Sequence, residues 1–285
     1  MSETEKRVAV VTGATGGIGR WIARGLAEAG LHVVLIGRNA DRAESAAQWI
    51  AQGAPGASTE TRLADLSSLR ATRTVGSAIA TSHPRIAVLV NNAGMFSARR
   101  QVTAEGREAV LAVNHLTPYV LTDALDDALR AGAPSRIVNV GSSKSDRARI
   151  DPNNLELTRG WGLSRAYGQS KLALMMSTFA RAERLRGSGV VANVVHPGLV
   201  ATGLVREGGV IGAAWRIMKL YARTEEQGAA TPLHVALSPD WATVTGAYVK
   251  DRVAVAPNPR ALDSALASAV ESSTRGLLAQ VFGAG

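Results

Sequence analysis

Short apolar runs alternate with longer stretches of helical spacing along almost the whole chain, and this alternation constrains the fold more than any other feature. Most of the runs hold Val, Ile and Leu at successive positions, which is typical of strands buried on both faces of a parallel sheet. Strands alternating with helices predict an α/β fold, with one doubly wound parallel sheet and helices on both faces. The predicted strands are residues 7–12, 32–36, 59–63, 86–90, 136–140, 190–195 and 245–250.

The expected helices follow these strands at regular spacing, and Ser67 is the predicted cap of the third one. No linker, low-complexity segment or repeat divides the chain, so we expect a single domain over residues 1–285. Two stretches, about 145–165 and 199–223, interrupt the alternation after strands. Both are expected to cover the carboxyl edge of the sheet, where such folds bind ligands. The predicted helices are residues 21–29, 40–52, 67–80, 103–129, 166–186 and 225–237.

Composition excludes several classes of function. The 285 residues include no cysteine, which removes disulfides, thiolate nucleophiles and Cys-ligated metals. His115, His196 and His234 do not have metal-ligand spacing and are interpreted as structural, so no metal is expected. The formal charge is +9, but the basic residues are spread along the chain and only 4% of residues are aromatic. We therefore expect an anionic small ligand rather than a nucleic acid as partner.

The start of the chain carries no recognisable targeting signal. Met1–Arg7 leads directly into an apolar run, and nowhere do 18 apolar residues follow one another. We therefore expect no signal peptide, no membrane partner and a cytoplasmic protein.

A glycine-rich loop, Thr12–Gly19 (TGATGGIG), lies between the first predicted strand and the first predicted helix. Gly13 would allow a tight turn, while Gly17 and Gly19 would let phosphates approach the backbone closely. The free N–H groups and the positive end of the helix dipole would then face a pyrophosphate. A glycine loop in this context predicts a dinucleotide site on a Rossmann-type sheet.

The end of the second predicted strand distinguishes the two nicotinamide dinucleotides. An NAD site places Asp or Glu there to bond the ribose hydroxyls, whereas this chain has Gly37-Arg38-Asn39. No carboxylate would repel a 2′-phosphate, and Arg38, assisted by Arg20 and Arg42, could bind it. A charge-assisted hydrogen bond of about 1.5–3 kcal/mol corresponds to a preference of roughly 10- to 150-fold. The sequence therefore predicts NADP(H) as the cofactor.

Tyr167 and Lys171 lie four positions apart in a predicted helix, which places their Cβ atoms roughly 5–6 Å apart on one face. A free tyrosine has a pKa of about 10, and a nearby positive charge lowers it. Lowering this pKa by ~3 units requires roughly 4 kcal/mol, more than one exposed lysine supplies. The spacing alone also fits two unrelated surface residues, so other motifs must decide.

Seven segments, taken in order, resemble the short-chain dehydrogenase/reductase family over nearly the full length of the chain. They are Thr12–Gly19, Asp65-Leu66, Asn91–Gly94 (NNAG), Asn114, Ser142 after RIVNVG, Tyr167–Lys171 (YGQSK) and His196–Thr202 (HPGLVAT). The resemblance implies a Rossmann-type fold and an oxidoreductase that depends on a nicotinamide dinucleotide.

The same resemblance implies a role for each catalytic residue. Tyr167 would be the general acid/base that protonates the carbonyl oxygen as hydride arrives. Lys171 would lower the pKa of Tyr167 and hold the nicotinamide ribose. Ser142, with Ser143 as a competitor, would bond the substrate oxygen, and Asn114 would hold a water in a proton relay to Lys171.

The resemblance also implies which residues bind the cofactor. Asp65 would contact adenine, Asn91 the adenosine side and Thr202 the carboxamide. The implied cofactor-binding residues are Gly13, Thr15, Gly17, Ile18, Gly19, Arg38, Asp65, Leu66, Asn91, Ala93, Gly94, Tyr167, Lys171, Pro197, Gly198, Val200 and Thr202.

Within this family, the chain resembles the retinol-dehydrogenase-like branch more closely than it resembles the family in general. The similarity lies in residues 103–125, 134–143 and 223–237. Ser142 and Tyr167 are 25 positions apart, and the branch has a similar extra segment over the site. This implies a roomy pocket and a bulky apolar substrate. Because no N-terminal anchor is recognisable, a lipid-dissolved retinoid is a poor fit.

The leading hypothesis is an NADPH-dependent carbonyl reductase acting on a bulky apolar substrate. The expected pocket walls are Met95, Phe96 and residues 145–161 and 199–221, which would suit an aromatic or polycyclic ketone of bacterial secondary metabolism. One alternative is an NADPH-dependent quinone reductase acting on an aromatic polyketide-type substrate. An alternative of another class is a non-catalytic NADP-binding sensor or scaffold.

The resemblance also implies a homo-oligomer, either a dimer or a tetramer. The family usually pairs subunits through the helices that correspond here to residues 103–129 and 166–186.

Overall fold

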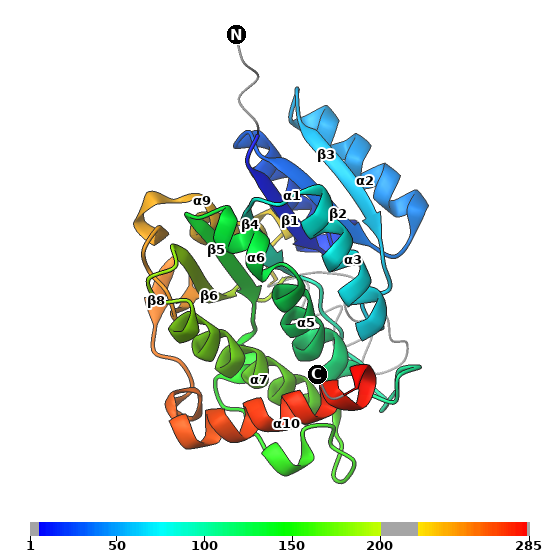
Figure 1. Cartoon of the computed structure of the whole chain (residues 1–285), viewed down its shortest axis with the longest axis vertical. Helices are drawn as coiled ribbons and strands as arrows, with labels where there is room; N and C mark the ends of the chain where they lie inside the picture. Colours follow the sequence, from blue (N-terminus) through cyan, green and yellow to red (C-terminus); the bar gives the residue numbers. More distant parts are fainter. Residues whose placement is uncertain (1–5, 201–221, 284–285) are drawn as a thin grey trace.

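The computed structural model describes residues 6–200 and 222–283. Within them, one sheet has the strand order β3-β2-β1-β4-β5-β6-β7-β8 (Figure 1). The described pairs are parallel up to β7, and β8 is antiparallel to β7. The strands are β1 (Val8–Thr12), β2 (His32–Gly37), β3 (Ser58–Leu63), β4 (Ile86–Asn91), β5 (Ser135–Val140), β6 (Val190–His196), β7 (Tyr248–Lys250) and β8 (Val253–Val255).

Helices connect the parallel strands, as the α/β prediction requires, and the predicted fold class is confirmed. One segment, η1 (Ala112–Leu116), is a π-helix between α4 and α5. No helix in the described part of the chain is long and apolar enough to cross a membrane. The α-helices are α1 (Gly17–Glu28), α2 (Ala40–Gly53), α3 (Leu69–Ser82), α4 (Ala109–Leu111), α5 (Thr117–Ala124), α6 (Asp126–Ala131), α7 (Leu163–Arg184), α9 (Glu225–Leu237) and α10 (Ser264–Phe282).

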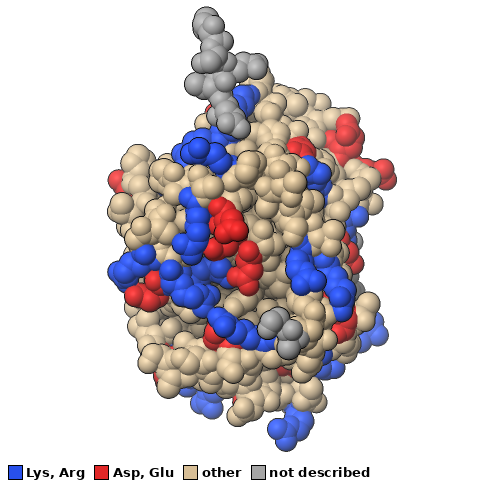
Figure 2. All heavy atoms as spheres, viewed as in Figure 1, with Lys and Arg blue, Asp and Glu red and all other residues tan. Residues whose placement is uncertain are grey.

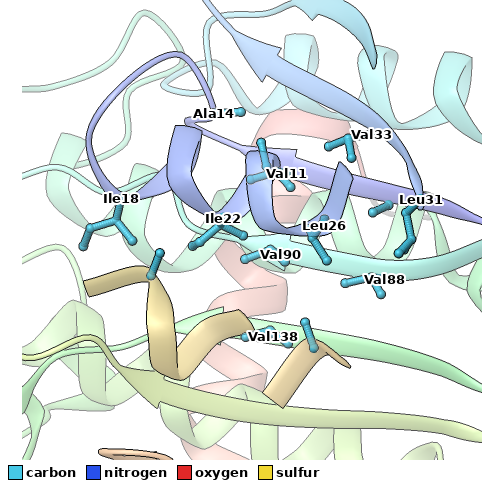
Figure 3. Close-up of a cluster of buried hydrophobic side chains, with 14 of the residues drawn as sticks. Val11, Ala14, Ile18, Ile22, Leu26, Leu31, Val33, Val88, Val90 and Val138 are labelled. Carbon is cyan, nitrogen blue, oxygen red and sulfur yellow. The ribbon is translucent and has the colours of Figure 1, made fainter. Parts of the chain in front are cut away.

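Both faces of the sheet are buried because successive residues of a strand point to opposite sides. Val11 and Val33 pack with α1 and α9 in one apolar cluster, shown in Figure 3. Val10 and Val34 pack with α3, α5 and α6 in a second cluster on the other face. The continuous apolar runs of the sequence thus supply two cores at once.

The order of the strands creates the crevice in which this kind of sheet binds ligands. β1 lies between β2 and β4, so the chain crosses to the other half of the sheet after β3. Loops leaving the carboxyl ends of β1 and β4 then diverge, which opens a crevice at this edge. The glycine loop follows β1, and Asn92–Gly94 follows β4.

The long helix predicted over residues 103–129 is instead a series of shorter pieces. Gly106 has a φ of +78°, and the chain turns there before α4 begins. Glu108 caps α4 by accepting a hydrogen bond from the Leu111 N–H at 2.7 Å. Leu125 separates α5 from α6. The apolar periodicity continues through these pieces, but the chain bends between them.

The cap of α3 also differs from the prediction. Ser68, not Ser67, accepts the hydrogen bond from the Ala71 N–H, because Asp65 binds both the N–H and the hydroxyl of Ser67. Two serines in succession could not be distinguished from the sequence.

The C-terminal helix α10 and the strand β8 were not predicted. Asp263 caps α10, which packs along α7 as Figure 1 shows. The Tyr119 hydroxyl donates to Glu271 at 2.7 Å, and His115 shares a 2.8 Å hydrogen bond with Thr274. These bonds fix α10 to α5 and η1. The buried, hydrogen-bonded His115 agrees with its interpretation as structural.

Charged side chains of both signs are mixed on the face formed by α5, α6, α7 and α10 (Figure 2). Arg130 pairs with Asp126 at 2.7 Å, and Arg184 pairs with Glu271 at 3.1 Å. Much of the positive charge on this face is therefore neutralised locally, which gives a polyanion little to bind.

Candidate active site

The glycine loop turns sharply between β1 and α1. Gly13 and Gly17 have φ values of +63° and +58°, a conformation that favours glycine. No described side chain caps α1 at Gly16, and no acid lies in the first turn of the helix. The N–H groups of that turn are left to an external anion. The loop therefore fits the pyrophosphate of a dinucleotide.

Gly19, predicted to let phosphates approach the backbone, also has a packing role. A Cβ atom at this position would overlap the Gly13 carbonyl and lie 2.5 Å from the Asn92 Nδ2 atom. The space at the Cβ position of Gly19 is thus filled by protein atoms. This glycine allows α1 to pack closely against the loop.

Asn92, which the sequence analysis did not single out, connects the two loops of the crevice. Its Nδ2 atom donates to the Thr12 carbonyl at 2.9 Å. In return, the Thr12 hydroxyl accepts from the Asn92 and Ala93 N–H groups, each at 2.9 Å. Its position beside Asn91 within NNAG was the available signal.

The side chain of Asn91, the residue predicted to contact the adenosine side of the cofactor, faces the interior. Asn91 is 2% exposed and donates to the Asn139 amide oxygen at 2.8 Å and to the Thr122 hydroxyl at 3.2 Å. As a strand residue, it points into the helices on one face of the sheet, whereas the crevice lies at the strand end. Only the backbone of Asn91 could approach a ligand.

Arg38 is exposed at the end of β2, and no described residue forms a hydrogen bond or ion pair with it. The Thr15 side chain packs over Gly37, where a Cβ atom would overlap it. A side chain at position 37 would therefore have to displace the Thr15 side chain. Arg20, in contrast, pairs with Glu225 at 3.3 Å, so its predicted help for Arg38 is not what the structure shows.

Asp65 and Leu66 follow β3 near the same edge of the sheet. Asp65 is exposed, but its Oδ1 atom accepts both bonds from Ser67, at 2.8 and 2.9 Å. Leu66 is buried, and its carbonyl accepts from the Thr117 hydroxyl at 2.6 Å. These bonds fix the turn, leaving the Asp65 Oδ2 atom for a ligand.

Tyr167 and Lys171 lie one turn apart on α7, and the Lys171 Nζ atom is 6.0 Å from the centre of the Tyr167 ring. Lys171 is 3% exposed and donates to the Val140 carbonyl at 2.8 Å. Burial lowers the pKa of Lys171 to about 8. Burial raises the pKa of Tyr167, while a hydrogen bond from Ser142 opposes the rise.

Ser142 occupies the position expected for the substrate-oxygen donor, and Ser143 does not. Ser142 follows β5, and its hydroxyl lies near enough to the Tyr167 phenol to lower the pKa of that phenol. It also accepts from the Lys144 N–H at 3.3 Å. Ser143 is exposed. The pairing with Tyr167 thus distinguishes the two serines.

Asn114 lies in the π-helical segment and is fully buried. Its amide donates to the Met95 carbonyl at 2.9 Å and to the Ser170 hydroxyl at 3.0 Å. Its Oδ1 atom accepts from the Met95 N–H at 2.7 Å. Both amide protons are used, so Asn114 fixes the loop after β4 against α7.

Comparisons with known proteins agree with this geometry. A family model described as short chain dehydrogenase matches residues 7–209. Retinol dehydrogenase 12 of Homo sapiens is 35% identical over 255 residues, which cover 90% of this chain and 81% of that protein. The chain belongs to the short-chain dehydrogenase/reductase family. Its similarity to the retinol dehydrogenases places it near that branch.

Solved structures have the same architecture. A protein of Mycobacterium paratuberculosis has a TM-score of 0.76 at 27% identity, covering 95% of this chain and 92% of that one. A short chain dehydrogenase from Burkholderia cenocepacia in complex with NADP has a TM-score of 0.69 at 30% identity, covering 86% and 95%. This member of the short-chain dehydrogenase/reductase family is therefore an enzyme, an oxidoreductase that depends on NAD(P)(H).

In this dehydrogenase/reductase, apolar side chains surround the Tyr167 ring. Phe96 lies edge-on to it, with ring centres 5.3 Å apart. Met95 and Trp161 pack in the same apolar cluster. The indole N–H of Trp161 donates to Glu108 at 3.3 Å, which holds residues 145–165 beside the site.

The segment after β6 is described only in part. Pro197 and Val200 are buried, and Val200 lies beside Ile18 against Gly228. These residues therefore lie close to the start of α1. Thr202 and residues 201–221 of the expected lid lie outside the described residues.

Proposed function

We propose that this enzyme reduces a carbonyl group of a bulky apolar substrate with NADPH, using Tyr167 as the proton donor. The observation that supports this most is the arrangement of Ser142, Tyr167 and Lys171. The Ser142 hydroxyl lies near enough to the Tyr167 phenol to lower its pKa, and the buried Lys171 ammonium lies one helical turn away. Such a set places donors where negative charge would develop on a reacting oxygen.

The protonation state of Tyr167 suits reduction. Burial raises the pKa of its phenol, so the phenol is protonated at neutral pH. The bound cofactor would supply hydride to the carbonyl carbon, and Tyr167 would give its proton to the carbonyl oxygen, forming an alcohol. Ser142 would donate a hydrogen bond to the same oxygen. Lys171 would stabilise the resulting phenolate until a proton returns.

Asn114 has a more specific role in this scheme than the sequence analysis stated. Its two amide protons are bonded to Met95 and Ser170. A water relay to Lys171 would have to use an oxygen of Asn114 instead. Its main contribution would be to hold Gly94 and Met95 at a fixed distance from Lys171.

The preference for NADPH over NADH rests on Arg38 and Gly37. Arg38 is a cation that no described residue neutralises, and Gly37 before it carries no carboxylate. Both features would favour a 2′-phosphate at the end of β2.

An apolar substrate is supported by Met95, Phe96 and Trp161 around Tyr167. Aromatic or polycyclic ketones would present a flat apolar surface to these side chains. Retinaldehyde is a second candidate, since curated relatives that are 35% and 36% identical to this chain are named retinol dehydrogenases. A quinone is a third, because hydride and proton delivery would convert it to a hydroquinone without creating a stereocentre.

The test is a panel of NADPH-oxidation assays with polycyclic ketones, retinaldehyde, other aldehydes and quinones. We expect ketone or aldehyde reduction in the wild type and a loss of at least 1,000-fold in kcat in Tyr167→Phe, on the order of general acid catalysis plus lost transition-state bonding. Tyr119→Phe is the matched control, because the Tyr119 hydroxyl bonds Glu271 on α10 rather than a residue beside Tyr167.

Two outcomes would contradict the proposal. Quinone reduction that survives in Tyr167→Phe would indicate a quinone reductase in which hydride transfer suffices. Tight NADPH binding with no turnover of any compound would indicate a sensor or scaffold.

We also propose that the protein is a homo-oligomer. Its interface would differ in part from the one that the family usually forms. Because α10 packs along α7, it covers part of the helical face through which the family usually pairs subunits. A groove of about 800 Å³ remains on this face, between α5, α6, α7 and α10. Sedimentation of the intact protein would distinguish a monomer from a dimer or tetramer.

A further inference from the structure

Three side chains far apart in the sequence meet near the amino-terminal edge of the sheet, away from the glycine loop. His32 begins β2, Glu60 lies in β3 and His83 is the C-cap of α3. His32 is opposite Ser58 in the parallel pair, so His32 and Glu60 project to the same side of the sheet. One potential ligand atom of each of these three residues lies within 4.8 Å of the other two.

A single carboxylate oxygen faces both imidazole rings. The Oε2 atom of Glu60 is 2.7 Å from the His83 Nε2 atom and 3.6 Å from the His32 Nε2 atom. The other oxygen, Oε1, pairs with Arg62. Arg62 thus orients the carboxylate without occupying the space between the histidines.

The surroundings of His32 match those of a metal-binding histidine. Its Nδ1 atom is 2.7 Å from the Ser58 hydroxyl, and an N–H donated there leaves the lone pair on Nε2. That Nε2 atom is buried and has no hydrogen-bond partner among the described residues. A lone pair then faces a carboxylate oxygen, an arrangement that a cation between them would stabilise. Metal-ligating histidines usually donate their second ring N–H to such a neighbour.

We propose that His32, Glu60 and His83 bind one Zn²⁺ ion, with water as a fourth ligand. Two imidazoles and one carboxylate are ligands that suit zinc. Donors about 2.0–2.2 Å from a tetrahedral ion lie roughly 3.3–3.5 Å from one another. The two histidine–carboxylate separations of 2.7 and 3.6 Å would each need to change by less than about 1 Å. The three side chains are 18–27% exposed, which gives them room to move and the ion a path of entry.

The ion would stabilise the fold rather than take part in the reaction. It would join β3, the edge strand of the sheet, to β2 and α3. Tyr167 and its partners lie at the opposite, carboxyl edge of the sheet. An ion that binds the folded state but not the unfolded chain stabilises the folded state by mass action.

The experiment uses the full chain after treatment with a chelator. Titration calorimetry with ZnCl₂ should show one equivalent of saturable binding. Thermal unfolding should shift upward by on the order of 5 °C at a free Zn²⁺ concentration of about 100 times Kd. Glu60→Gln keeps the shape of the side chain and should weaken zinc binding by at least tenfold, as should the double variant His32→Gln/His83→Gln.

His234→Gln is the matched control, because His234 lies on α9 outside the proposed site and its loss should leave zinc binding unchanged. Circular dichroism would verify that each variant is folded. The proposal is overturned if the wild type shows no saturable binding. It is equally overturned if the folded Glu60→Gln and double variants bind zinc as the wild type does, since the ion would then be held elsewhere.

Discussion

Lys171 and Arg38 are both cations near the cofactor crevice, but their surroundings differ. Lys171 is buried, and its pKa is lowered to about 8. Arg38 is exposed at the end of β2. Burial strengthens the electrostatic interactions of the Lys171 charge but makes that charge costly to keep in the folded protein. The exposed charge of Arg38 costs little, and its interactions are screened by water. The expected effects of substitution follow from this contrast.

Replacing Lys171 by Met should stabilise the folded protein at neutral pH. Below pH 8 the native state must keep a buried positive charge, and the lowered pKa corresponds to a cost of about 3 kcal/mol. As the pH rises from 8 to 10.5, the unfolded chain binds the extra proton, so the wild type gains stability and the difference shrinks. Urea unfolding of both proteins at pH 7 and pH 10.5 would measure this. A gain that is the same at both pH values would contradict the assigned cause.

Replacing Arg38 by Glu should raise the KM for NADPH by roughly 100-fold and change the KM for NADH far less. The substitution removes a partner of the 2′-phosphate and adds a repelling charge. Arg38→Gln is the control, because it removes the attraction to the 2′-phosphate without adding a repulsion. Its KM for NADPH should lie between those of the wild type and Arg38→Glu. Steady-state kinetics with both cofactors would measure the effect. Equal changes in the two KM values would exclude Arg38 as the selective residue.

At the scale of elements, the crevice depends on how closely two loops approach each other. Asn92 and Thr12 bind the loop after β4 to the glycine loop. Gly19 allows α1 to lie directly against Gly13. Contacts of this kind set the position of the helix N-terminus relative to the phosphates.

Gly19→Ala should destabilise the fold by about 1–3 kcal/mol, because its Cβ atom would displace the Gly13 carbonyl or Asn92. Cofactor affinity should fall at least tenfold, since the glycine loop moves. For stability, Gly16→Ala is the control: no described atom lies within 4 Å of its Cβ position, and its φ of 174° suits any residue. Urea unfolding and fluorescence titration with NADPH would test both effects. Similar unfolding free energies for the two variants would refute the packing role of Gly19.

At the scale of the whole molecule, α10 joins distant parts of the chain. Glu271, half-buried on this helix, accepts hydrogen bonds from Tyr119 on α5 and Arg184 on α7. The helix α7, which carries Tyr167 and Lys171, is therefore supported by a segment that the sequence analysis did not predict.

Glu271→Ala should lower the free energy of unfolding by about 1–3 kcal/mol, because it leaves a partly buried hydroxyl and a guanidinium without their partner. Glu183→Ala is the control, since Glu183 is exposed and pairs with Arg186 on the surface, so its loss should have little effect. Chemical unfolding would compare the two. Comparable losses of unfolding free energy in both variants would mean that the Glu271 contacts do not hold α10 in place.

The sequence by itself determined the fold class, the parallel strands and the approximate positions of most helices. Apolar periodicity is a local property that depends on burial on one or both faces. It also determined which motifs meet at the crevice, since parallel strands end at one edge of the sheet. Ser142, Tyr167 and Lys171 come together as expected.

Only the tertiary structure decided how individual side chains are used. It assigned the Asn91 side chain to the interior and Asn92 to the crevice, although the two are neighbours in one motif. It paired Arg20 with Glu225, broke the helix predicted over 103–129 and placed α10 on α7. It also brought His32, Glu60 and His83 together from three elements. These outcomes depend on contacts between residues distant in the chain, which no local pattern records.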